Sequence, residues 1–516
     1  MRQVFSRAEW IAAGATALLL ILSFPNFEFY PLAWIALVPL LVVIARHPSP
    51  RRAFLLGWLA GSVFFYTTCY WLTYSMIHYG GLPTVLAYLL LIPGAVVVGI
   101  FPGLFALVLA LTLKKWGTWA VLLAPIFWTA FEWIRLGVTG QLWNALGYSQ
   151  AYHWFLTQPA RWGGVYAVSF LIVAVNSAVA LLILGRTRWT VATTLAMILA
   201  VAFVIYISPG TFRYVDSFSL DGDLKIVAVQ PNVPMTVVKS VGETNDLIER
   251  HFALSERGLQ NLSDSRGPRL VIWPESPMNF SYSSDKALQE RLAAFTKQNH
   301  TSLLFNSQEP APGDGSYNSA LLINEEGRLI SQYDKIRLMP FGEYVPLPQW
   351  LPGASLISGI VGEFTPGDKY TLMPVGYSRA GVFICIESAY PWIARRLSSD
   401  GAQMLINISN DGYLGPTAVM RQHLANAIFR AAENGEPVLR VTNTGLTALI
   451  DDRGRVTDLT AAFQPDVRVW HEPVSSSSET FYTRHGDLFV QICTAITFMV
   501  LIAILISGRR SFGRLR

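Results

Sequence analysis

The sequence predicts a polytopic α-helical membrane bundle that carries an external α/β domain, and three observations support this prediction. First, 52% of the 516 residues are hydrophobic and only 14% are charged, whereas soluble globular chains carry about a quarter charged residues. Second, eight apolar segments approach or exceed the length that a membrane-spanning helix needs. Third, a polar region between the last two of these segments has the alternating strand and helix patterns of a layered α/β domain.

The apolar segments predict eight membrane crossings. A spanning helix needs about 20 apolar residues, so the first two segments are short, and a re-entrant pair remains an alternative for them. The fourth is too long for an upright helix, and its prolines and glycines predict a kinked or tilted one. The first lacks a clear small-x-small cleavage site and is interpreted as a retained span, not a secretion signal. The segments are residues 10–24, 32–45, 53–76, 85–113, 119–134, 165–184, 189–207 and 488–506.

Basic residues predict the orientation of the bundle. Lysines and arginines precede the first segment, follow the second, fourth and sixth, and end the chain. The other loops hold almost none, apart from Arg135 and Arg161 in one longer loop. Because Lys and Arg are enriched in cytoplasmic loops, both termini are predicted to be cytoplasmic and the polar region to be external. The predicted domains are a seven-helix membrane region, an external domain, and a last helix with a basic tail, at residues 1–210, 224–482 and 488–516.

The polar region contains short apolar runs that predict buried strands. A helix is predicted at 417–433, between the last two of them, and Gly327 marks a hairpin turn. Residues 346–368 are rich in Pro and Gly but contain the apolar run 356–361, which predicts a mobile loop. The predicted strands are residues 225–230, 270–273, 302–305, 320–324, 381–386, 404–409 and 438–442.

Three residues at or near strand ends are candidates for catalysis. Glu275 ends the run Val-Ile-Trp-Pro-Glu, Lys335 lies in Tyr-Asp-Lys-Ile-Arg, and Cys385 closes Gly-Val-Phe-Ile-Cys. Ligands usually bind at the carboxyl edge of an α/β sheet, because the loops converge there. Taken singly, each has a plainer interpretation. Glu275 could be a glutamate at a helix N-terminus, Lys335 a surface lysine and Cys385 a structural cysteine. Paired CxxC and HExxH spacings are absent from the sequence, so no metal site and no cofactor are expected.

Taken together, the three strings resemble the Glu-Lys-Cys active site of the nitrilase superfamily. The resemblance extends over nearly the whole chain to the membrane-embedded branch of that superfamily, the apolipoprotein N-acyltransferases, through the strings at 146–150 and 340–346. It implies a nitrilase-like αββα sandwich inserted before the last of eight spans. One departure is that Met-Thr-Val-Val-Lys follows residues 230–234, where family members often carry an aromatic residue nearby. This departure puts in doubt an acyl-lining role for that segment.

The resemblance also implies the reaction and its partners. Cys385 would carry a fatty-acyl thioester, Glu275 would act as general base, and Lys335 would stabilise the oxyanion. The acyl donor would be a phospholipid, typically phosphatidylethanolamine, and the acceptor the α-amino group of the diacylglyceryl-cysteine of an apolipoprotein. The expected location is the bacterial inner membrane, with the catalytic domain in the periplasm. The bilayer is thus a partner, and no nucleic acid is expected.

Further residues near the three strings are assigned supporting roles. Glu343 is expected either to hydrogen-bond Lys335 or to accept protons beside Glu275, with a plain loop carboxylate as the alternative. Glu387, two residues after the cysteine, would share its face on a strand and is expected to make a structural pairing. Tyr344 and Tyr390 are expected to line the entrance to the site. His423 is interpreted as a helix-surface residue and not as part of a Cys–His dyad.

Two other functions remain open at this point. A membrane-anchored nitrilase-like amidase would use the same three residues with water as the acceptor, but would need neither eight spans nor an apolar loop near the site. A non-catalytic lipoprotein-binding component would be expected to have lost at least one of the three residues, and this chain retains all of them.

Overall fold

The computed structural model describes nine stretches of the chain, and these form two compact units. The first unit comprises Met1–Ile77, Gly81–Arg213 and Thr480–Arg516, and the second comprises His78–Gly80 and Tyr214–Glu479. Most of the predicted mobile loop at 346–368 lies outside the described residues, including its apolar run 356–361. The described residues are 5–211, 219–235, 241–262, 267–275, 277–313, 315–340, 342–344, 364–474 and 479–512.

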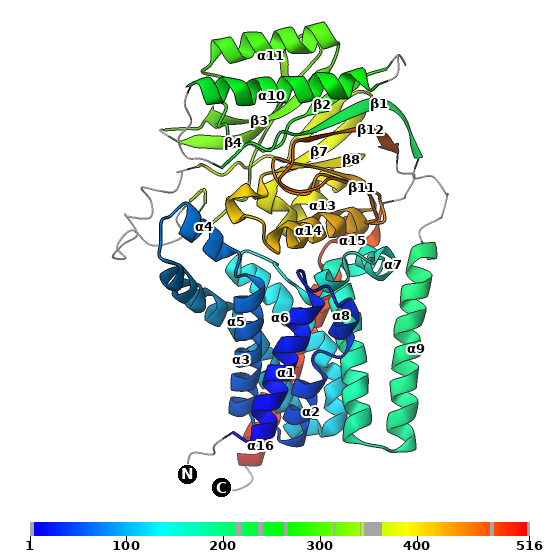
Figure 1. Ribbon diagram of the computed structural model, residues 1–516. Coiled ribbons are helices and arrows are strands. Elements are labelled where there is room, and N and C mark those ends of the chain that lie inside the picture. Colours follow the sequence, from blue (N-terminus) through cyan, green and yellow to red (C-terminus); the bar gives the residue numbers. More distant parts are fainter. Residues whose placement is uncertain are drawn as a thin grey trace. The chain divides into compact units, whose positions relative to one another are not determined.

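The first unit is a bundle of helices (Figure 1). Short 3-10 helices η1 (Tyr30–Trp34), η2 (Thr118–Leu123) and η3 (Leu146–Gln150) connect or extend the α-helices. The α-helices are α1 (Arg7–Ser23), α2 (Val38–Arg46), α3 (Pro50–Thr68), α4 (Leu72–His78), α5 (Thr84–Trp116), α6 (Ala124–Thr139), α7 (Trp154–Thr157), α8 (Ala160–Leu184), α9 (Arg188–Thr211), α15 (Phe481–His485) and α16 (Leu488–Phe512).

Several helices of the bundle can cross a membrane. Within the described residues, five are long and apolar enough, namely α5, η2 with α6, α8, α9 and α16. A sixth is added if α3 and α4, which are bent by 49° at their junction, count as one span. The first two predicted segments form helices shorter than 18 residues, α1 with 17 and Tyr30–Arg46. These helices identify the chain as a membrane protein. The number of eight crossings stays a prediction.

Small residues allow α3 and α5 to approach closely. A Cβ atom placed on Gly99 of α5 would lie 2.2 Å from the hydroxyl of Ser62 on α3. Gly57 and Gly61 of α3 face Pro102 of α5 in the same way, with the nearest atoms 2.5 Å and 2.7 Å from a placed Cβ. Without a hydrophobic driving force in lipid, such close backbone contact is a main source of helix association.

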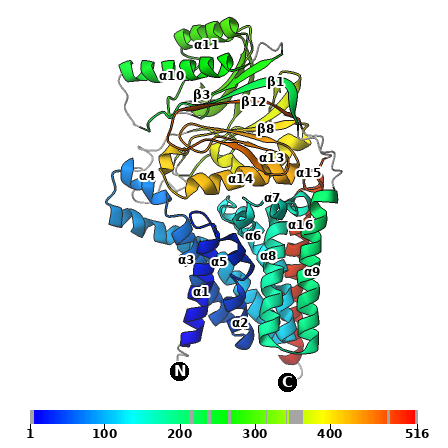
Figure 2. The same ribbon diagram turned by 45° about the vertical axis from the view of Figure 1, so that its right-hand side comes forward.

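The last helix returns to the first part of the bundle, although the second unit separates them in the chain. Phe489 of α16 packs edge-on against Phe170 of α8, with ring centroids 5.5 Å apart. Just before α16, Asp487 accepts a hydrogen bond of 3.1 Å from the indole of Trp133 on α6. In Figure 2 the red ribbon of α16 runs beside α8. These contacts join the two ends of the chain in one bundle.

The second unit contains two six-stranded sheets. The strand order is β12-β1-β2-β3-β4-β5 in the first sheet and β11-β10-β9-β8-β7-β6 in the second. In each sheet three consecutive central strands run parallel, β1-β2-β3 and β7-β8-β9. The strands are β1 (Ser219–Gln230), β2 (Arg269–Ile272), β3 (Ser302–Pro310), β4 (Ser316–Ile323), β5 (Leu329–Asp334), β6 (Leu372–Val375), β7 (Ser378–Ile384), β8 (Met404–Ser409), β9 (Val438–Thr442), β10 (Ala448–Ile450), β11 (Val456–Leu459) and β12 (Asp466–Val474).

Alternate residues of each strand face two different cores. Ile226 and Ile272 of the first sheet share one buried cluster with Val382 and Ile406 of the second. The opposite face of the first sheet packs against α10 (Val241–Gln260) and α11 (Lys286–Asn299), which lie side by side in Figure 1. The opposite face of the second sheet packs against α13 (Pro391–Ser399) and α14 (Val419–Asn434) (Figure 2). The period-two alternation of a strand makes this layering possible.

One predicted strand ends earlier than expected. The strand predicted at 381–386 stops at Ile384, and the 3-10 helix η4 (Cys385–Ala389) follows at once. The apolar residue Ile386 extended the strand pattern in the sequence, but Cys385 has φ +51°, a left-handed conformation that cannot continue a strand. The strand thus does not continue to residue 387, so the condition under which Glu387 would share a strand face with Cys385 is not met.

Candidate active site

Lys335 lies at the centre of the candidate site, directly after β5. Its side chain is 1% exposed, and Nζ lies 2.8 Å from Oε1 of Glu343 and 3.2 Å from Oε1 of Glu275. Its backbone N–H donates to the carbonyl of Asn318 at 2.8 Å, which fixes the start of the side chain. Burial by itself would lower the pKa of Lys335, but the two carboxylates raise it well above its usual value. The buried side chain is therefore a charged ammonium.

Glu275 follows β2 and bridges the two sheets through its carboxylate. Oε1 accepts a hydrogen bond of 3.0 Å from the side-chain amide of Asn318 on β4 of the first sheet. Oε2 accepts one of 3.1 Å from the backbone N–H of Asn410, which follows β8 of the second sheet. A carboxylate held from both sides in this way has little freedom to rotate away from Lys335.

Glu343 is the second carboxylate partner of the ammonium group. Its Oε1 accepts hydrogen bonds from Nζ of Lys335 at 2.8 Å and from the amide of Asn318 at 2.6 Å. Its Oε2 accepts a third from the backbone N–H of Met339 at 2.7 Å. Of the roles considered for Glu343, the hydrogen bond to Lys335 is therefore present, and the residue is only 8% exposed.

Cys385 occupies the sharp turn between β7 and η4. The residue is half-buried, and its positive φ is unusual for a residue with a side chain, so the turn is strained. Burial raises the pKa of the thiol, the charge of Glu275 raises it further, and the charge of Lys335 opposes both. The net shift is upward, so the resting sulfur is a thiol. The structure thus brings the three predicted residues into mutual electrostatic contact.

Glu387 ties the turn at Cys385 to the segment that carries Lys335. Oε1 accepts hydrogen bonds from the backbone N–H groups of Ile336 and Arg337 at 2.7 Å and 3.0 Å, and Oε2 accepts one from Ile384 at 2.7 Å. The hydroxyl of Tyr333 lies 2.9 Å from both oxygens. Complete burial raises the pKa of Glu387 to about 7, and the N–H donors oppose that rise. The carboxyl group acts as a clamp between two loops.

The two tyrosines differ in their surroundings. Tyr390 is 4% exposed, and its ring packs edge-on against Trp392 at 5.0 Å, with the guanidinium of Arg337 over it at 5.9 Å. Tyr344 is 37% exposed and lies next to the undescribed residues 345–363. Their expected role in lining the entrance stays a prediction.

His423 of α14 is not a surface residue, and that prediction is wrong. It is 2% exposed, and Nε2 lies 2.9 Å from the backbone carbonyl oxygen of Cys385. Nδ1 lies 2.7 Å from Oδ1 of Asp411. The other carboxylate oxygen of Asp411 accepts a hydrogen bond of 2.8 Å from Arg440. Nε2 of His423 therefore contacts the backbone carbonyl of Cys385 and not its sulfur.

Sequence reasoning missed the polar residues that hold the site together. Asn318, Asp411 and Arg440 lie on or beside strands and are at most 8% exposed. A polar side chain within an apolar strand pattern is the signal that these positions offered, because buried polar groups require partners. The partner of each lies far away in the chain, and the sequence pattern does not identify it.

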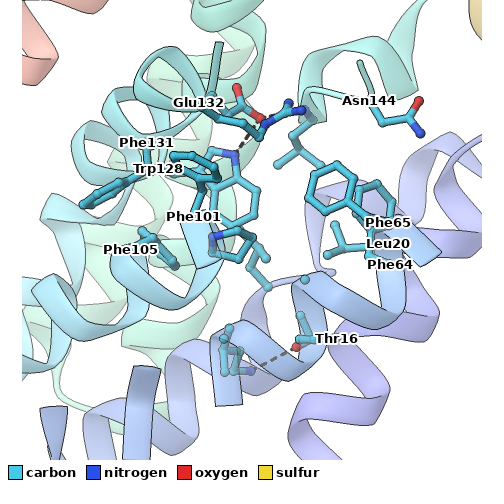
Figure 3. Close-up of a pocket in the computed structure, with 18 of the residues that line it drawn as sticks. Thr16, Leu20, Phe64, Phe65, Phe101, Phe105, Trp128, Phe131, Glu132 and Asn144 are labelled. Carbon is cyan, nitrogen blue, oxygen red and sulfur yellow. Dashed lines mark hydrogen bonds between the residues drawn. The ribbon is translucent and has the colours of Figure 1, made fainter. Parts of the chain in front are cut away.

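The membrane bundle contains a separate apolar cavity between α1, α3, α5 and α6 (Figure 3). Aromatic side chains point into it, including Phe64, Phe105 and Trp128. At its polar end, Glu132 accepts hydrogen bonds from the Trp128 indole at 2.9 Å and from a backbone N–H at 2.7 Å. Arg135 donates to a backbone carbonyl at 2.8 Å. These bonds hold both charged side chains to neighbouring parts of the bundle.

The described residues contain no group of three or more His, Cys, Asp and Glu side chains that could hold a metal ion. The candidate site is built instead from one ammonium, two carboxylates and one thiol. Such a set can deprotonate a nucleophile, stabilise an oxyanion and form a covalent acyl intermediate.

Comparison with known proteins identifies the family. Residues 16–178 match the model of the apolipoprotein N-acyltransferase N-terminal domain, and residues 228–494 match that of carbon-nitrogen hydrolases. An apolipoprotein N-acyltransferase of Geobacter metallireducens is 31% identical over 499 residues, which cover 95% of this chain and 94% of the relative. The chain belongs to the apolipoprotein N-acyltransferase family.

Other members of the apolipoprotein N-acyltransferase family match over similar lengths. The Thermotoga maritima protein is 28% identical over 515 residues, covering 95% of this chain and 93% of its own. Among solved structures, an amidase from Nesterenkonia sp. covers 52% of this chain and 95% of its own length, with 15% identity and a TM-score of 0.36. Membership of the family makes this membrane protein an acyltransferase, so the predicted enzyme class is confirmed.

Proposed function

We propose that the chain carries out the last step of lipoprotein maturation, by moving a fatty-acyl chain from a phospholipid to an apolipoprotein. The acceptor is the α-amino group of an N-terminal diacylglyceryl-cysteine, and the acyl group passes through a thioester on Cys385. Family membership supports the overall reaction. The observation that supports the route is a buried ammonium between two carboxylates, beside a thiol on a strained turn.

In the first half-reaction, the Cys385 sulfur attacks the ester carbonyl of the phospholipid. Because the resting group is a thiol, its proton must leave as the bond forms, and Glu275 accepts it. Of the two carboxylates, Glu275 has the larger effect on the pKa of Cys385, which supports its choice over Glu343 as the base. The tetrahedral oxyanion binds the Lys335 ammonium. On collapse, the ester C–O bond breaks and the leaving alkoxide of the lysophospholipid takes the proton from Glu275.

In the second half-reaction, the acceptor amine attacks the thioester carbonyl. Lys335 again stabilises the oxyanion, and Glu275 accepts a proton from the amine nitrogen. The C–S bond then breaks, and the proton passes from Glu275 to the departing sulfur, which restores the thiol. The two substrates use one site in turn, which predicts ping-pong kinetics.

We place eight crossings in the bacterial inner membrane, both termini in the cytoplasm and the second unit in the periplasm, as a nitrilase-like αββα sandwich. The domains are residues 1–210, 224–482 and 488–516, and the preferred donor is phosphatidylethanolamine. The distribution of lysines and arginines supports the orientation. Two packed sheets with helices on their outer faces support the sandwich.

Intact mass spectrometry after incubation with phosphatidylethanolamine alone tests the thioester. The expected result is one added acyl mass that maps to Cys385 and is removed by neutral hydroxylamine. A Cys385→Ser variant should show no hydroxylamine-labile adduct, whereas a Cys69→Ser variant, altered within the bundle, should keep it. An unmodified wild-type chain, under conditions that support turnover with both substrates, would contradict the covalent route.

A further inference from the structure

The hydrogen bond from His423 to Cys385 fixes a peptide group next to the nucleophile. Nε2 lies 2.9 Å from the carbonyl oxygen of Cys385. That oxygen can only accept a hydrogen bond, so Nε2 carries the hydrogen in either charge state of the ring. The peptide group between Cys385 and Ile386 is planar, and in its trans form the carbonyl and the following N–H point in opposite directions. Holding the carbonyl of Cys385 therefore also sets the direction of the Ile386 N–H.

The imidazole ring of His423 is itself held firmly. Its Nδ1 lies 2.7 Å from Oδ1 of Asp411. The other oxygen of Asp411 accepts a hydrogen bond of 2.8 Å from Arg440, whose second terminal nitrogen donates to Asn407 at 2.5 Å. Burial by itself would raise the pKa of Asp411, but Arg440 and His423 lower it below its usual value, so the carboxylate is charged. Asp411 and Arg440 are 1% and 0% exposed, so bulk solvent does not reach these bonds.

The peptide that His423 holds lies where an oxyanion donor is needed. Ile386 belongs to the first turn of η4, and the first N–H groups of a helix have no acceptor within the helix. It directly follows the nucleophile, so its N–H is close to any carbonyl that Cys385 attacks. The left-handed conformation of Cys385 is disfavoured for a residue with a side chain, so the turn needs contacts that prevent it from relaxing.

We propose that His423 is a positioning residue that holds the Cys385–Ile386 peptide so that the Ile386 N–H serves as the second oxyanion donor beside Lys335. The assignment rests on the proposed thioester route. His423 acts through the backbone and does not deprotonate the sulfur, because its Nε2 is bonded to the carbonyl oxygen of Cys385. Loss of His423 should therefore slow reactions that form a tetrahedral oxyanion, and should leave a simple displacement by the thiol unchanged.

Two amide substitutions in the full-length protein separate these effects. His423→Gln places an amide N–H near the position of Nε2, whereas the shorter side chain of His423→Asn ends near the position of Nδ1 and cannot reach the carbonyl. Acyl transfer from phosphatidylethanolamine to a diacylglyceryl-cysteine peptide gives kcat and KM. Alkylation of Cys385 by iodoacetamide forms no oxyanion and reports on the thiol alone.

The expected result is a loss of about 10²–10³ in kcat for His423→Asn, the effect of one oxyanion donor. KM and the alkylation rate should stay at wild-type values. The kcat of His423→Gln should be at least about tenfold higher than that of His423→Asn. Equal kcat in wild type and His423→Asn would overturn the proposal. Equal impairment of both variants, or a parallel fall in alkylation, would also overturn it. A wild-type chain that forms no acyl-Cys385 would instead contradict the thioester route itself.

Discussion

The ammonium of Lys335 and the carboxylate of Glu343 form a buried ion pair of 2.8 Å, shorter than the 3.2 Å contact between Lys335 and Glu275. Two carboxylates thus share one cation. If Glu275 is the base, it must gain a proton during the reaction, and the cation then retains Glu343 as its charged partner. This arrangement assigns different tasks to two residues of the same type.

Glu343→Gln is expected to act mainly on stability, and Glu275→Gln mainly on rate. Glu343→Gln removes one of the two carboxylates and leaves Glu275 as the partner of Lys335. The loss of stability should therefore be smaller than the cost of an unpaired buried charge, about 3–5 kcal/mol, but large enough to lower the Tm in detergent. Loss of the general base should cost about 10²–10⁴ in kcat for Glu275→Gln, with a larger fall in kcat than for Glu343→Gln. Scanning fluorimetry and the rate of Cys385 acylation are the measurements. Equal loss of rate in both variants, with an unchanged Tm for Glu343→Gln, would instead assign proton transfer to both carboxylates.

The clamp formed by Glu387 predicts a pH-dependent contribution to stability. Burial raises the pKa of Glu387 from 4.5 to about 7 in the folded protein. A group whose folded pKa is raised contributes stability that is complete below its unfolded pKa and is lost as the pH rises through the folded value. The window is therefore about pH 4.5–7, and the shift corresponds to about 3 kcal/mol.

The measurement compares the Tm of wild type and Glu387→Gln at pH 5 and pH 8. The glutamine cannot accept from every N–H group of the clamp, so the variant should be less stable throughout. The difference between the two proteins should be larger at pH 5 than at pH 8. Parallel Tm curves across this range would show that Glu387 does not titrate there.

Gly445 provides an independent test of the bonds that hold His423. A Cβ atom at this position would lie 2.2 Å from Oδ2 of Asp411, so Gly445→Ala must displace that carboxylate. The displacement should lower kcat in the same direction as His423→Asn and reduce stability by about 1–3 kcal/mol. Gly258→Ala is the control, since its Cβ would meet Val227 at 2.3 Å, far from Asp411 in the fold. Gly258→Ala should lower the Tm and leave kcat unchanged. If Gly258→Ala lowered kcat as much as Gly445→Ala does, the effect on kcat could not be attributed to displacement of Asp411.

Two glycines of α5 test the packing of the membrane helices. A Cβ atom placed on Gly99 would lie 2.2 Å from the Ser62 hydroxyl, whereas a Cβ atom placed on Gly94 would meet no atom within 4 Å. Gly99→Ala should therefore separate α3 from α5 and lower the Tm. Gly94→Ala should leave it unchanged or raise it, because alanine is favoured over glycine within a helix by about 0.5–1 kcal/mol. The same Tm for both variants would show that the close approach of α3 and α5 contributes nothing measurable.

The sequence predicted the parts of the molecule that local patterns encode. Apolar length indicated the long helices, and short apolar runs indicated the central strands. The strings around Glu275, Lys335 and Cys385 identified three residues that the structure brings together. Each of these features depends on residues close to one another in the chain.

The supporting residues could not be predicted in the same way, because their partners are distant in sequence. Asn318 of β4 bonds two carboxylates that follow β2 and β5. His423 lies among polar residues of α14, a pattern typical of a solvated face, yet its ring points to Asp411 and Cys385. The strand predicted through Ile386 shows the same limit, since the clamp that ends it at Ile384 involves Tyr333 on another strand.

The pairing of β12 with β1 has a consequence for biosynthesis. These strands begin and end the second unit, and their register joins Ser219 to Val474. A ribosome makes β1 early and β12 last, so one edge of β1 stays open until nearly the whole unit has been translated. Open strand edges are sites of aggregation, so a nascent chain that stalls before residue 466 should need protection by a chaperone. The residues of α16 follow those of β12 in the chain, so the bundle acquires its final helix last.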